Sequence, residues 1–279
     1  MERIFNLDGT PKYNATAGYI ASKELKSAVN ASITLGRPIL IKGEPGTGKT
    51  MLAKSIAESL GLELVVWSIK STTKAKDGLY IYDTVQRLYD SQFGEGGVSD
   101  ISRYIHLGKL GEAFTSADPV VLLIDEIDKA DLEFPNDLLW ELDMLSFYIP
   151  ETRETITARR TPIVVITSNA EKELPDAFLR RCVFHFIEFP DEVMMKEIIQ
   201  VHYPDLDRRL ADSATKAFYR IRDIKGITKK PSTGELLDWI KVLRGEGVGP
   251  DLIEREIPLM GVLIKKDEDV AMAKKGLAE

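Results

Sequence analysis

The sequence predicts an α/β fold in its first two-thirds and a smaller all-helical region after it. Short apolar runs recur at intervals long enough for crossover helices, which is typical of parallel strands covered on both faces. After Pro190 the apolar residues change to helical spacing, without a convincing strand. We therefore expect an α/β core over about residues 1–190 and a small helical domain over residues 191–279.

The elements of the core follow from these patterns in chain order. A helix is predicted over residues 20–35, closed by Gly36 and Pro38, and others over residues 51–60 and 131–145. The predicted strands cover residues 39–41, 64–67, 120–124, 163–166 and 183–189. Residues 120–124, the longest apolar run, are too short for a membrane span, which needs about 20 residues.

The region after Pro190 reads as a series of helices over residues 193–203, 206–222 and 233–243. Ser232 and Glu235 have the spacing of a capping box at the start of the third helix. The last fifteen residues, rich in Lys, Asp and Glu, are predicted to form a solvated helix or a frayed tail.

Composition excludes several classes of protein. The 279 residues carry 37 Lys and Arg against 44 Asp and Glu, a net charge of −7, which argues against broad electrostatic binding to nucleic acid. The first residues lack an apolar signal core, and the single cysteine, Cys182, cannot form an intramolecular disulfide. We therefore expect a cytoplasmic protein without a membrane span.

A phosphate-binding loop connects the first predicted core strand to the helix that begins at Met51, and Met51 is also expected to contact the nucleotide. It has the pattern G-x-x-x-x-G-K-[ST], formed by Gly43, Glu44, Pro45, Gly46, Thr47, Gly48, Lys49 and Thr50. Glycines let the backbone direct its N–H groups at phosphate oxygens, and the helix N-terminus adds a positive dipole. Lys49 is expected to bridge the β- and γ-phosphates of ATP, and Thr50 to ligate Mg²⁺.

Polar side chains follow two later strands. Asp125 and Glu126 end the strand over residues 120–124; Asp125 is expected to hold Mg²⁺ and Glu126 to polarise the attacking water. Taken alone, acids after an apolar strand are more often helix N-caps than catalysts, but the phosphate-binding loop reverses this preference. Asn169 follows the strand over residues 163–166 and could hydrogen-bond the water and the γ-phosphate, or be an ordinary turn residue.

Two arginines, Arg180 and Arg181, precede the last core strand. They could form a solvated surface, or point into the ATP site of a neighbouring subunit and stabilise transition-state charge as an arginine finger.

The order of these motifs resembles the AAA+ ATPases, and within them the MoxR family and its CoxD-like group. The shared motifs lie at residues 43–50, 122–126, 167–169 and 174–181. The resemblance to the subgroup depends on residues 19–22, 69–73 and 134–137, which are not general ATPase motifs, and it covers almost the whole chain.

The resemblance implies a five-stranded parallel sheet with a helical lid, assembled into a ring, commonly a hexamer, with ATP between subunits. It implies Asn169 as the sensor 1 residue, Arg181 rather than Arg180 as the arginine finger, and Tyr19 with Ile20 near the adenine. It also places an insertion at about residues 70–110 and a hairpin at about residues 146–158.

One position departs from the family pattern. Gly234 stands where many AAA+ proteins have a sensor 2 arginine in the lid. Lys229 or Lys230 could substitute, or the lid could respond to nucleotide through packing alone.

The resemblance implies a ring-forming ATP hydrolase that remodels a protein client together with a von Willebrand factor A domain partner. For the CoxD-like group the implied client is a metalloenzyme, such as a molybdenum-containing oxidoreductase. The alternative is a nucleic-acid motor or loader, for which Lys70, Lys74 and Lys76 form a short basic cluster. A non-hydrolysing scaffold is the third reading, against which Glu126 and Asn169 speak.

Overall fold

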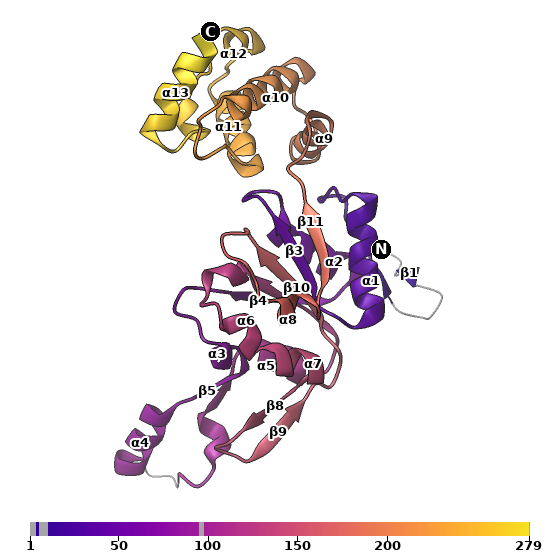
Figure 1. Ribbon diagram of the computed structural model, residues 1–279, viewed down its shortest axis with the longest axis vertical. Helices are drawn as coiled ribbons and strands as arrows, with labels where there is room; N and C mark the ends of the chain where they lie inside the picture. The colour runs from indigo at the N-terminus through magenta and orange to yellow at the C-terminus, as the bar shows by residue number, and fades with distance from the viewer. Residues whose placement is uncertain (1–3, 6–10, 95–97, 279) are drawn as a thin grey trace. The chain divides into compact units, whose positions relative to one another are not determined.

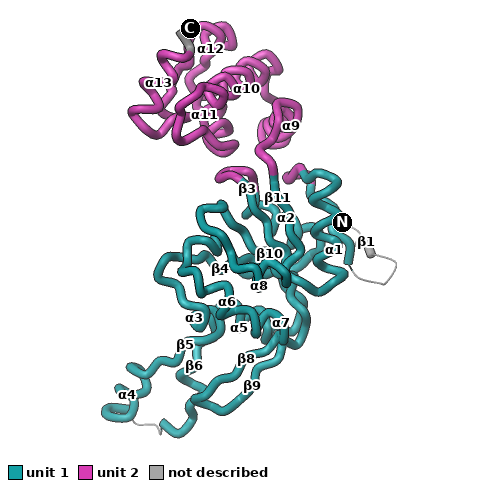
Figure 2. Tube along the Cα trace, viewed as in Figure 1, with its two compact units in different colours: residues 1–16, 21–43, 49–187 teal, residues 17–20, 44–48, 188–279 magenta. Residues whose placement is uncertain are grey.

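The computed structural model describes residues 4–5, 11–94 and 98–278. The chain divides into two compact units, coloured separately in Figure 2. The core unit comprises residues 1–16, 21–43 and 49–187, and the helical unit comprises residues 17–20, 44–48 and 188–279. Residues 44–48 of the phosphate-binding loop therefore group with the helices rather than with the sheet.

The core unit contains a five-stranded parallel sheet with the order β11-β3-β10-β7-β4 (Figure 1). Its strands are β3 (Ile39–Gly43), β4 (Glu63–Ser68), β7 (Val120–Asp125), β10 (Ile163–Ser168) and β11 (Val183–Ile187). The predicted α/β fold, with a parallel sheet followed by a helical region, is confirmed.

Burial explains why these runs form strands. The interior strand β7 is buried from Val120 to Ile124, as expected for a strand covered on both faces. The edge strand β11 instead alternates, leaving Phe184 and Phe186 exposed. Helix α2 (Lys49–Leu60) contacts the four strands β3, β10, β7 and β4, and α5 (Lys109–Thr115) contacts β7 and β4.

Two predicted helices differ from the structure. Helix α1 (Lys23–Leu35) begins three residues later than predicted, because the Ser22 hydroxyl accepts the Leu25 N–H at 3.1 Å and caps the helix. The helix predicted over residues 131–145 is two short helices, α6 (Phe134–Asp137) and α7 (Leu139–Met144). At Leu138 the chain tightens to a three-residue hydrogen bond with the carbonyl of Pro135, which interrupts the helix.

The predicted insertion contains elements that the sequence did not indicate. Helix α3 (Ala75–Leu79) leads into β5 (Tyr80–Tyr82), which pairs with β6 (Ile105–Leu107) in an antiparallel ribbon. Helix α4 (Thr84–Phe93) lies between them, followed by the short 3₁₀-helix η1 (Ile101–Tyr104). Residues 95–97 of the insertion lie outside the described residues.

Helix α4 has an apolar face that the described residues of the chain leave exposed. None of its residues is buried. The exposed apolar side chains recur at helical spacing: Val85, Leu88, Tyr89 and Phe93.

Two further antiparallel pairs complete the core unit. Strands β8 (Ser146–Ile149) and β9 (Glu154–Thr157) form a hairpin at the place where the family carries one. Near the N-terminus, β1 (Ile4–Phe5) pairs with β2 (Pro11–Lys12).

The helical unit packs its helices around large apolar side chains that include Phe218 and Trp239. Its elements are α9 (Glu192–His202), α10 (Arg208–Asp223), α11 (Thr233–Gly245), α12 (Pro250–Arg255), η3 (Met260–Val262) and α13 (Asp267–Ala278). Ser232 and Glu235 form the predicted capping box, with the Ser232 N–H donating to the Glu235 carboxylate at 2.7 Å. The predicted tail is a helix whose Ala273 is fully buried. Across the described ranges of the chain, no helix has the length and apolarity that crossing a bilayer requires.

Candidate active site

The candidate catalytic residues of the core unit lie at the carboxyl ends of neighbouring strands. In the sheet, β10 runs between β3 and β7, with Ile166 opposite both Leu40 and Ile124. The ends of these three strands therefore meet at one edge of the sheet. Ligands of open α/β sheets bind at this edge.

A chain of hydrogen bonds joins the Thr50 hydroxyl to the end of β7. Thr50 Oγ1 donates to Asp125 at 3.1 Å to Oδ1 and 3.3 Å to Oδ2. The fully buried Thr167 donates to Asp125 Oδ1 at 2.6 Å and accepts the Glu126 N–H at 2.8 Å. These bonds fix the Asp125 carboxylate beside the first turn of α2.

Hydroxyl and carboxylate oxygens of this kind fit Mg²⁺. Mg²⁺ is commonly held by one or two carboxylates together with substrate phosphates, rather than by a cage of protein ligands. In the described part of the chain, no group of three or more His, Cys, Asp or Glu side chains could form such a cage. Thr50 and Asp125 are thus the residues that would hold Mg²⁺ beside ATP.

The Glu126 backbone turns sharply after β7. Its φ of 60° lies in the left-handed region, which is uncommon for a residue other than glycine. Strained backbone of this kind gathers at functional sites. The turn directs the Glu126 carboxylate to Asn169, whose Nδ2 donates to Oε1 at 3.1 Å, and to Lys129, which forms an ion pair with Oε2. The hydrogen bond with Glu126 raises the pKa of Lys129, so this side chain is an ammonium at neutral pH.

Asn169 is held by a buried carboxylate. Asp128 is 2% exposed, and its Oδ2 accepts the N–H groups of Asn169 at 3.1 Å and Glu171 at 2.9 Å. Ala170 between them has a left-handed φ of 60°. Asp128 therefore fixes the loop that presents the Asn169 amide to Glu126.

Lys49 opens α2 with a buried side chain. It is 6% exposed, and its Nζ donates to the carbonyl of Gly43 at 2.8 Å. The ammonium thus sits next to the residue where the phosphate-binding loop begins. Met51, two residues later, is 45% exposed.

The middle of the phosphate-binding loop, residues 44–48, lies within the helical unit. Gly46 and Gly48 have φ angles of 79° and 86°, which L side chains rarely adopt. A Cβ atom at Gly48 would lie 3.3 Å from the ring of Tyr19, so that ring rests against the loop. Tyr19 and Ile20 belong to the same unit; their contact with adenine stays a prediction.

The two arginines lie directly after α8 (Asp176–Leu179), and both are exposed. Arg181 forms an ion pair with Asp143 through Nε, and its Nη1 donates to the Ala177 carbonyl at 2.9 Å. Arg181 is thereby oriented within its own chain.

Cys182 has the environment of an unreactive thiol. Burial, followed by the Asp143 carboxylate, raises its pKa to about 12. Only the thiolate is nucleophilic, and its fraction rises about tenfold per pH unit below the pKa. We expect iodoacetamide to alkylate Cys182 at least about 100-fold more slowly than free cysteine at pH 7.5, with the rate rising up to pH 11. A rate near that of free cysteine at pH 7.5, measured by mass spectrometry, would contradict this.

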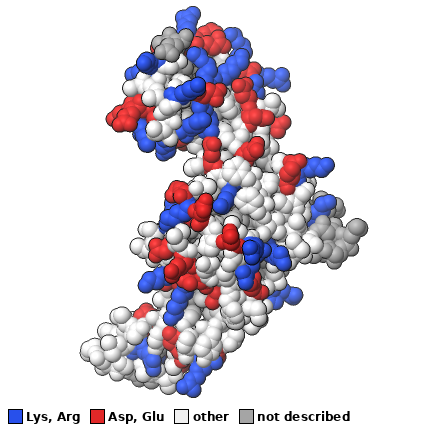
Figure 3. Space-filling model, in the orientation of Figure 1, with Lys and Arg blue, Asp and Glu red and all other residues white. Residues whose placement is uncertain are grey.

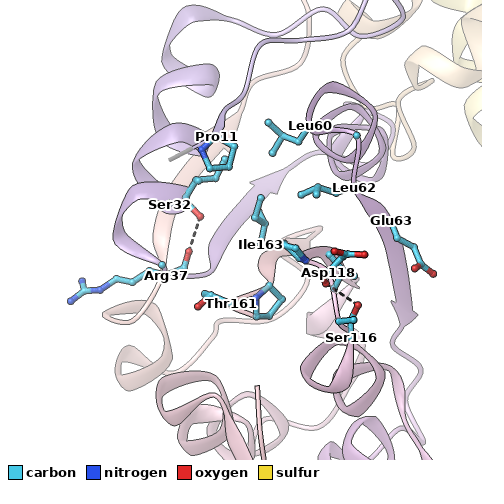
Figure 4. A pocket seen from close by; sticks show the side chains of 17 residues that line it. Pro11, Ser32, Arg37, Leu60, Leu62, Glu63, Ser116, Asp118, Thr161 and Ile163 are labelled. Carbon is cyan, nitrogen blue, oxygen red and sulfur yellow. Dashed lines mark hydrogen bonds between the residues drawn. The ribbon is translucent and has the colours of Figure 1, made fainter. Parts of the chain in front are cut away.

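A cavity of about 610 Å³ lies at the other edge of the sheet (Figure 4). It is lined at the first residues of β4, β7 and β10 by Glu63, Val120 and Ile163. Its hydroxyls bond to neighbouring backbone, with Ser32 donating to the Arg37 carbonyl at 2.7 Å. The cavity is therefore separate from the candidate catalytic residues.

The sequence analysis assigned no role to Thr167, Lys129 or Asp128. Thr167 is the next-to-last residue of the buried strand β10, and Asp128 and Lys129 follow the acidic pair within one turn. The signal in the sequence was a polar residue next to a motif and close to a buried strand, because a buried polar group needs a hydrogen-bond partner.

Replacing Thr167 by valine tests its part in this arrangement. The change keeps the shape but leaves the partly buried Glu126 N–H without its acceptor, so we expect the free energy of unfolding to fall by about 1 kcal/mol. ATP hydrolysis should fall as well, because Asp125 and Glu126 both lose a contact. Urea unfolding and a phosphate-release assay measure the two effects. Thr155→Val on the exposed side of β9 is the matched control, and an equal loss in both variants would contradict the assignment.

Comparison with known proteins places this geometry in a family. The model of the AAA family, "ATPase family associated with various cellular activities", matches residues 39–191. A putative 26S proteasome regulatory subunit homolog of Methanothermobacter thermautotrophicus is 28% identical over 204 residues, which is 68% of this chain and 45% of that protein. A putative pachytene checkpoint protein 2 of Caenorhabditis elegans is 25% identical over 177 residues, which is 61% of this chain and 38% of that protein.

A third relative is an ATP-dependent zinc metalloprotease FtsH of Ureaplasma parvum, 23% identical over 183 residues, which is 64% of this chain and 22% of that protein. The chain spans less than half the length of each of these relatives. The family match covers more than half of the chain and includes the phosphate-binding loop, Asp125, Glu126 and Asn169. The chain therefore belongs to the AAA family of ATPases.

Proposed function

We propose that the chain hydrolyses ATP to ADP and phosphate with the residues at the carboxyl edge of its sheet. The observation that carries the proposal is the hydrogen-bonded series from Thr50 through Asp125 and Thr167 to Glu126. Lys49 and the loop N–H groups would bind the β- and γ-phosphates. Bound Mg²⁺, held by Thr50 and Asp125, would offset the phosphate charge.

Glu126 would orient the attacking water and accept its proton as the water oxygen bonds to the γ-phosphorus. The bond from the γ-phosphorus to the β–γ bridging oxygen would break in the same step, with ADP as the leaving group. Asn169 and Lys129 both contact the Glu126 carboxylate in the structure. Each oxygen of an ionised carboxylate has two acceptor sites, so Glu126 could accept a hydrogen bond from the water while it keeps both contacts.

We further propose that Arg181 completes the site of a neighbouring copy in a ring, commonly a hexamer for proteins of this type. Members of the AAA family typically form oligomeric rings. Arg181 is exposed and held by Asp143, which suits a side chain that projects from its own subunit. Arg180 is the alternative. The division at about residue 190 into core and lid, and a cytoplasmic location, are part of the same proposal.

The proposed work of the ring is to remodel a protein client. The motifs at residues 19–22, 69–73 and 134–137 resemble the MoxR family and its CoxD-like group, which supports a von Willebrand factor A domain partner and a metalloenzyme client, such as a molybdenum-containing oxidoreductase. The exposed apolar face of α4 favours contact with protein rather than with a polyanion.

A nucleic-acid motor is the second candidate, and it depends on the basic cluster of Lys70, Lys74 and Lys76. Lys76 Nζ lies 3.9 Å from Glu151 Oε1 and 4.9 Å from the centre of the Tyr80 ring. The Lys76 charge therefore already interacts with a carboxylate and an aromatic ring of the same chain. On the face drawn in Figure 3, acidic and basic side chains are interspersed. Both observations favour the protein client.

A substrate trap distinguishes the two candidates. The Glu126→Gln variant with ATP should retain a client and a von Willebrand factor A protein that the same variant releases with ADP. The matched control is Glu133→Gln, a change at an exposed residue in the segment after β7. Stimulation of ATP hydrolysis by DNA or RNA, with no ATP-dependent protein retention, would overturn the proposal in favour of the motor.

A further inference from the structure

A buried arginine of the helical unit forms an ion pair with a residue of the phosphate-binding loop. Arg222, in the last turn of α10, donates from Nη2 to the Glu44 carboxylate at 2.8 Å. The Arg222 side chain is 8% exposed, whereas that of Glu44 is 52% exposed. Glu44 is the second residue of the loop, so the contact joins positions 178 residues apart within one unit.

The Arg222 guanidinium is held rigidly by its surroundings. Its Nη1 donates to the carbonyl of Pro231, and its Cζ lies 3.3 Å from the centre of the Phe189 ring. The Phe218 ring lies 5.8 Å away on the same helix. An arginine fixed by stacking and by a backbone acceptor loses little freedom when it binds a carboxylate. Arg222 is therefore the fixed partner, and Glu44 is the residue that it positions.

A second contact joins the same two segments. A Cβ atom at Gly46 would lie 2.3 Å from Cβ of Ser232, the residue that caps α11. The backbone of the loop thus approaches the start of α11 as closely as a glycine allows. Ser232 directly follows Pro231, which accepts the hydrogen bond from Arg222. The last turn of α10 therefore contacts the loop at Glu44, and the N-cap of α11 contacts it at Gly46.

We propose that Arg222 is a positioning residue for nucleotide binding. By holding the Glu44 carboxylate, it fixes residues 44–48 in the conformation that presents their N–H groups to phosphate oxygens. Nucleotide and helical unit are then coupled: phosphate on the loop stabilises the connection between α10 and α11, and that connection stabilises the loop. The inference rests on the nucleotide site proposed above.

Two substitutions that keep the fold test the coupling. Arg222→Lys keeps the charge and much of the aliphatic side chain, but it lacks the planar guanidinium that donates to Pro231 and to Glu44 from two separate nitrogens. Glu44→Gln removes the charge of the more exposed partner. With fluorescent mant-ADP and the full chain, we expect each single variant to raise Kd about tenfold. The double variant should also show about a tenfold increase, because both changes remove one interaction.

Two measurements distinguish a role of Arg222 in positioning the loop from a general disturbance of the fold. KM for ATP should rise in the variants, while kcat at saturating ATP stays within about twofold, as expected when only binding is weakened. In hydrogen exchange, ADP should protect residues 224–232 in the wild type and protect them less in either variant. Arg209→Lys is the matched control, since Arg209 lies on the same helix in an exposed ion pair with Asp251 and should bind mant-ADP normally.

The outcomes distinguish this inference from the proposed function. If Lys49→Ala abolishes mant-ADP binding but neither Arg222→Lys nor Glu44→Gln changes Kd, the coupling is wrong and the site stands. An increase of about 100-fold in the double variant would also overturn the coupling, because the two residues would then act independently. Binding that survives Lys49→Ala would overturn the nucleotide site, and the coupling with it.

Discussion

Replacing Glu126 by glutamine is expected to lower kcat for ATP hydrolysis by about 10²–10⁴-fold while leaving ATP binding in place. Glutamine has nearly the same shape, so the contact with Asn169 and the backbone turn at residue 126 can persist. It cannot accept a proton from the attacking water. Phosphate release and mant-ATP titration measure the two quantities on the same preparation.

The control for this variant is Glu133→Gln, which removes an exposed carboxylate nearby and should retain the wild-type rate. Hydrolysis by Glu126→Gln at more than about a tenth of the wild-type rate would show that another group accepts the proton. Loss of ATP binding together with loss of turnover would instead indicate a structural role for Glu126.

Replacing Arg181 by alanine is expected to lower kcat by about 10³-fold, with a small change in ATP affinity, if the residue acts on the site of the next subunit. The test is complementation. Arg181→Ala subunits have an intact loop but no finger, and Lys49→Ala subunits have the finger but no functional loop. In a ring mixed randomly at equal amounts, about a quarter of the interfaces combine both intact halves, so activity should return to about that fraction.

Arg180→Ala is the matched control for Arg181, since it removes a neighbouring exposed arginine. If Arg180→Ala loses activity and Arg181→Ala keeps it, Arg180 is the finger. Mixed rings without recovered activity would contradict a shared site. So would turnover per subunit that is both independent of protein concentration and unaffected by Arg181→Ala.

Much of this fold is predictable because its signals are local. Runs such as residues 120–124 are apolar at every position, which only a strand buried on both faces requires. The insertion is harder, since β5 and β6 have three residues each and their pairing joins segments more than twenty residues apart. The divided helix at Leu138 was missed because the apolar spacing continues through the break.

In the candidate site, too, the residues that belong to local motifs were predictable, whereas those that depend on tertiary contacts were not. Lys49, Thr50, Asp125 and Glu126 belong to contiguous motifs whose residue types are dictated by phosphate and Mg²⁺ chemistry. Arg222 belongs to no motif, and its role depends on the tertiary contact with Glu44. The sequence showed that Gly234 supplies no guanidinium to the lid, and it directed attention to Lys229 and Lys230. An arginine within an amphipathic helix gave no indication that it would be buried.

The grouping of residues 44–48 with the helices has a practical consequence for dissecting this protein. A fragment that ends at Ile187 would keep every catalytic carboxylate and the whole sheet. It would lose Arg222 and Ser232, the neighbours that hold the middle of the loop. Truncation after Ile187 would thus remove the residues that hold the phosphate-binding loop in place while leaving the loop itself in the fragment. Deletion studies should therefore be replaced by point substitutions in the intact polypeptide.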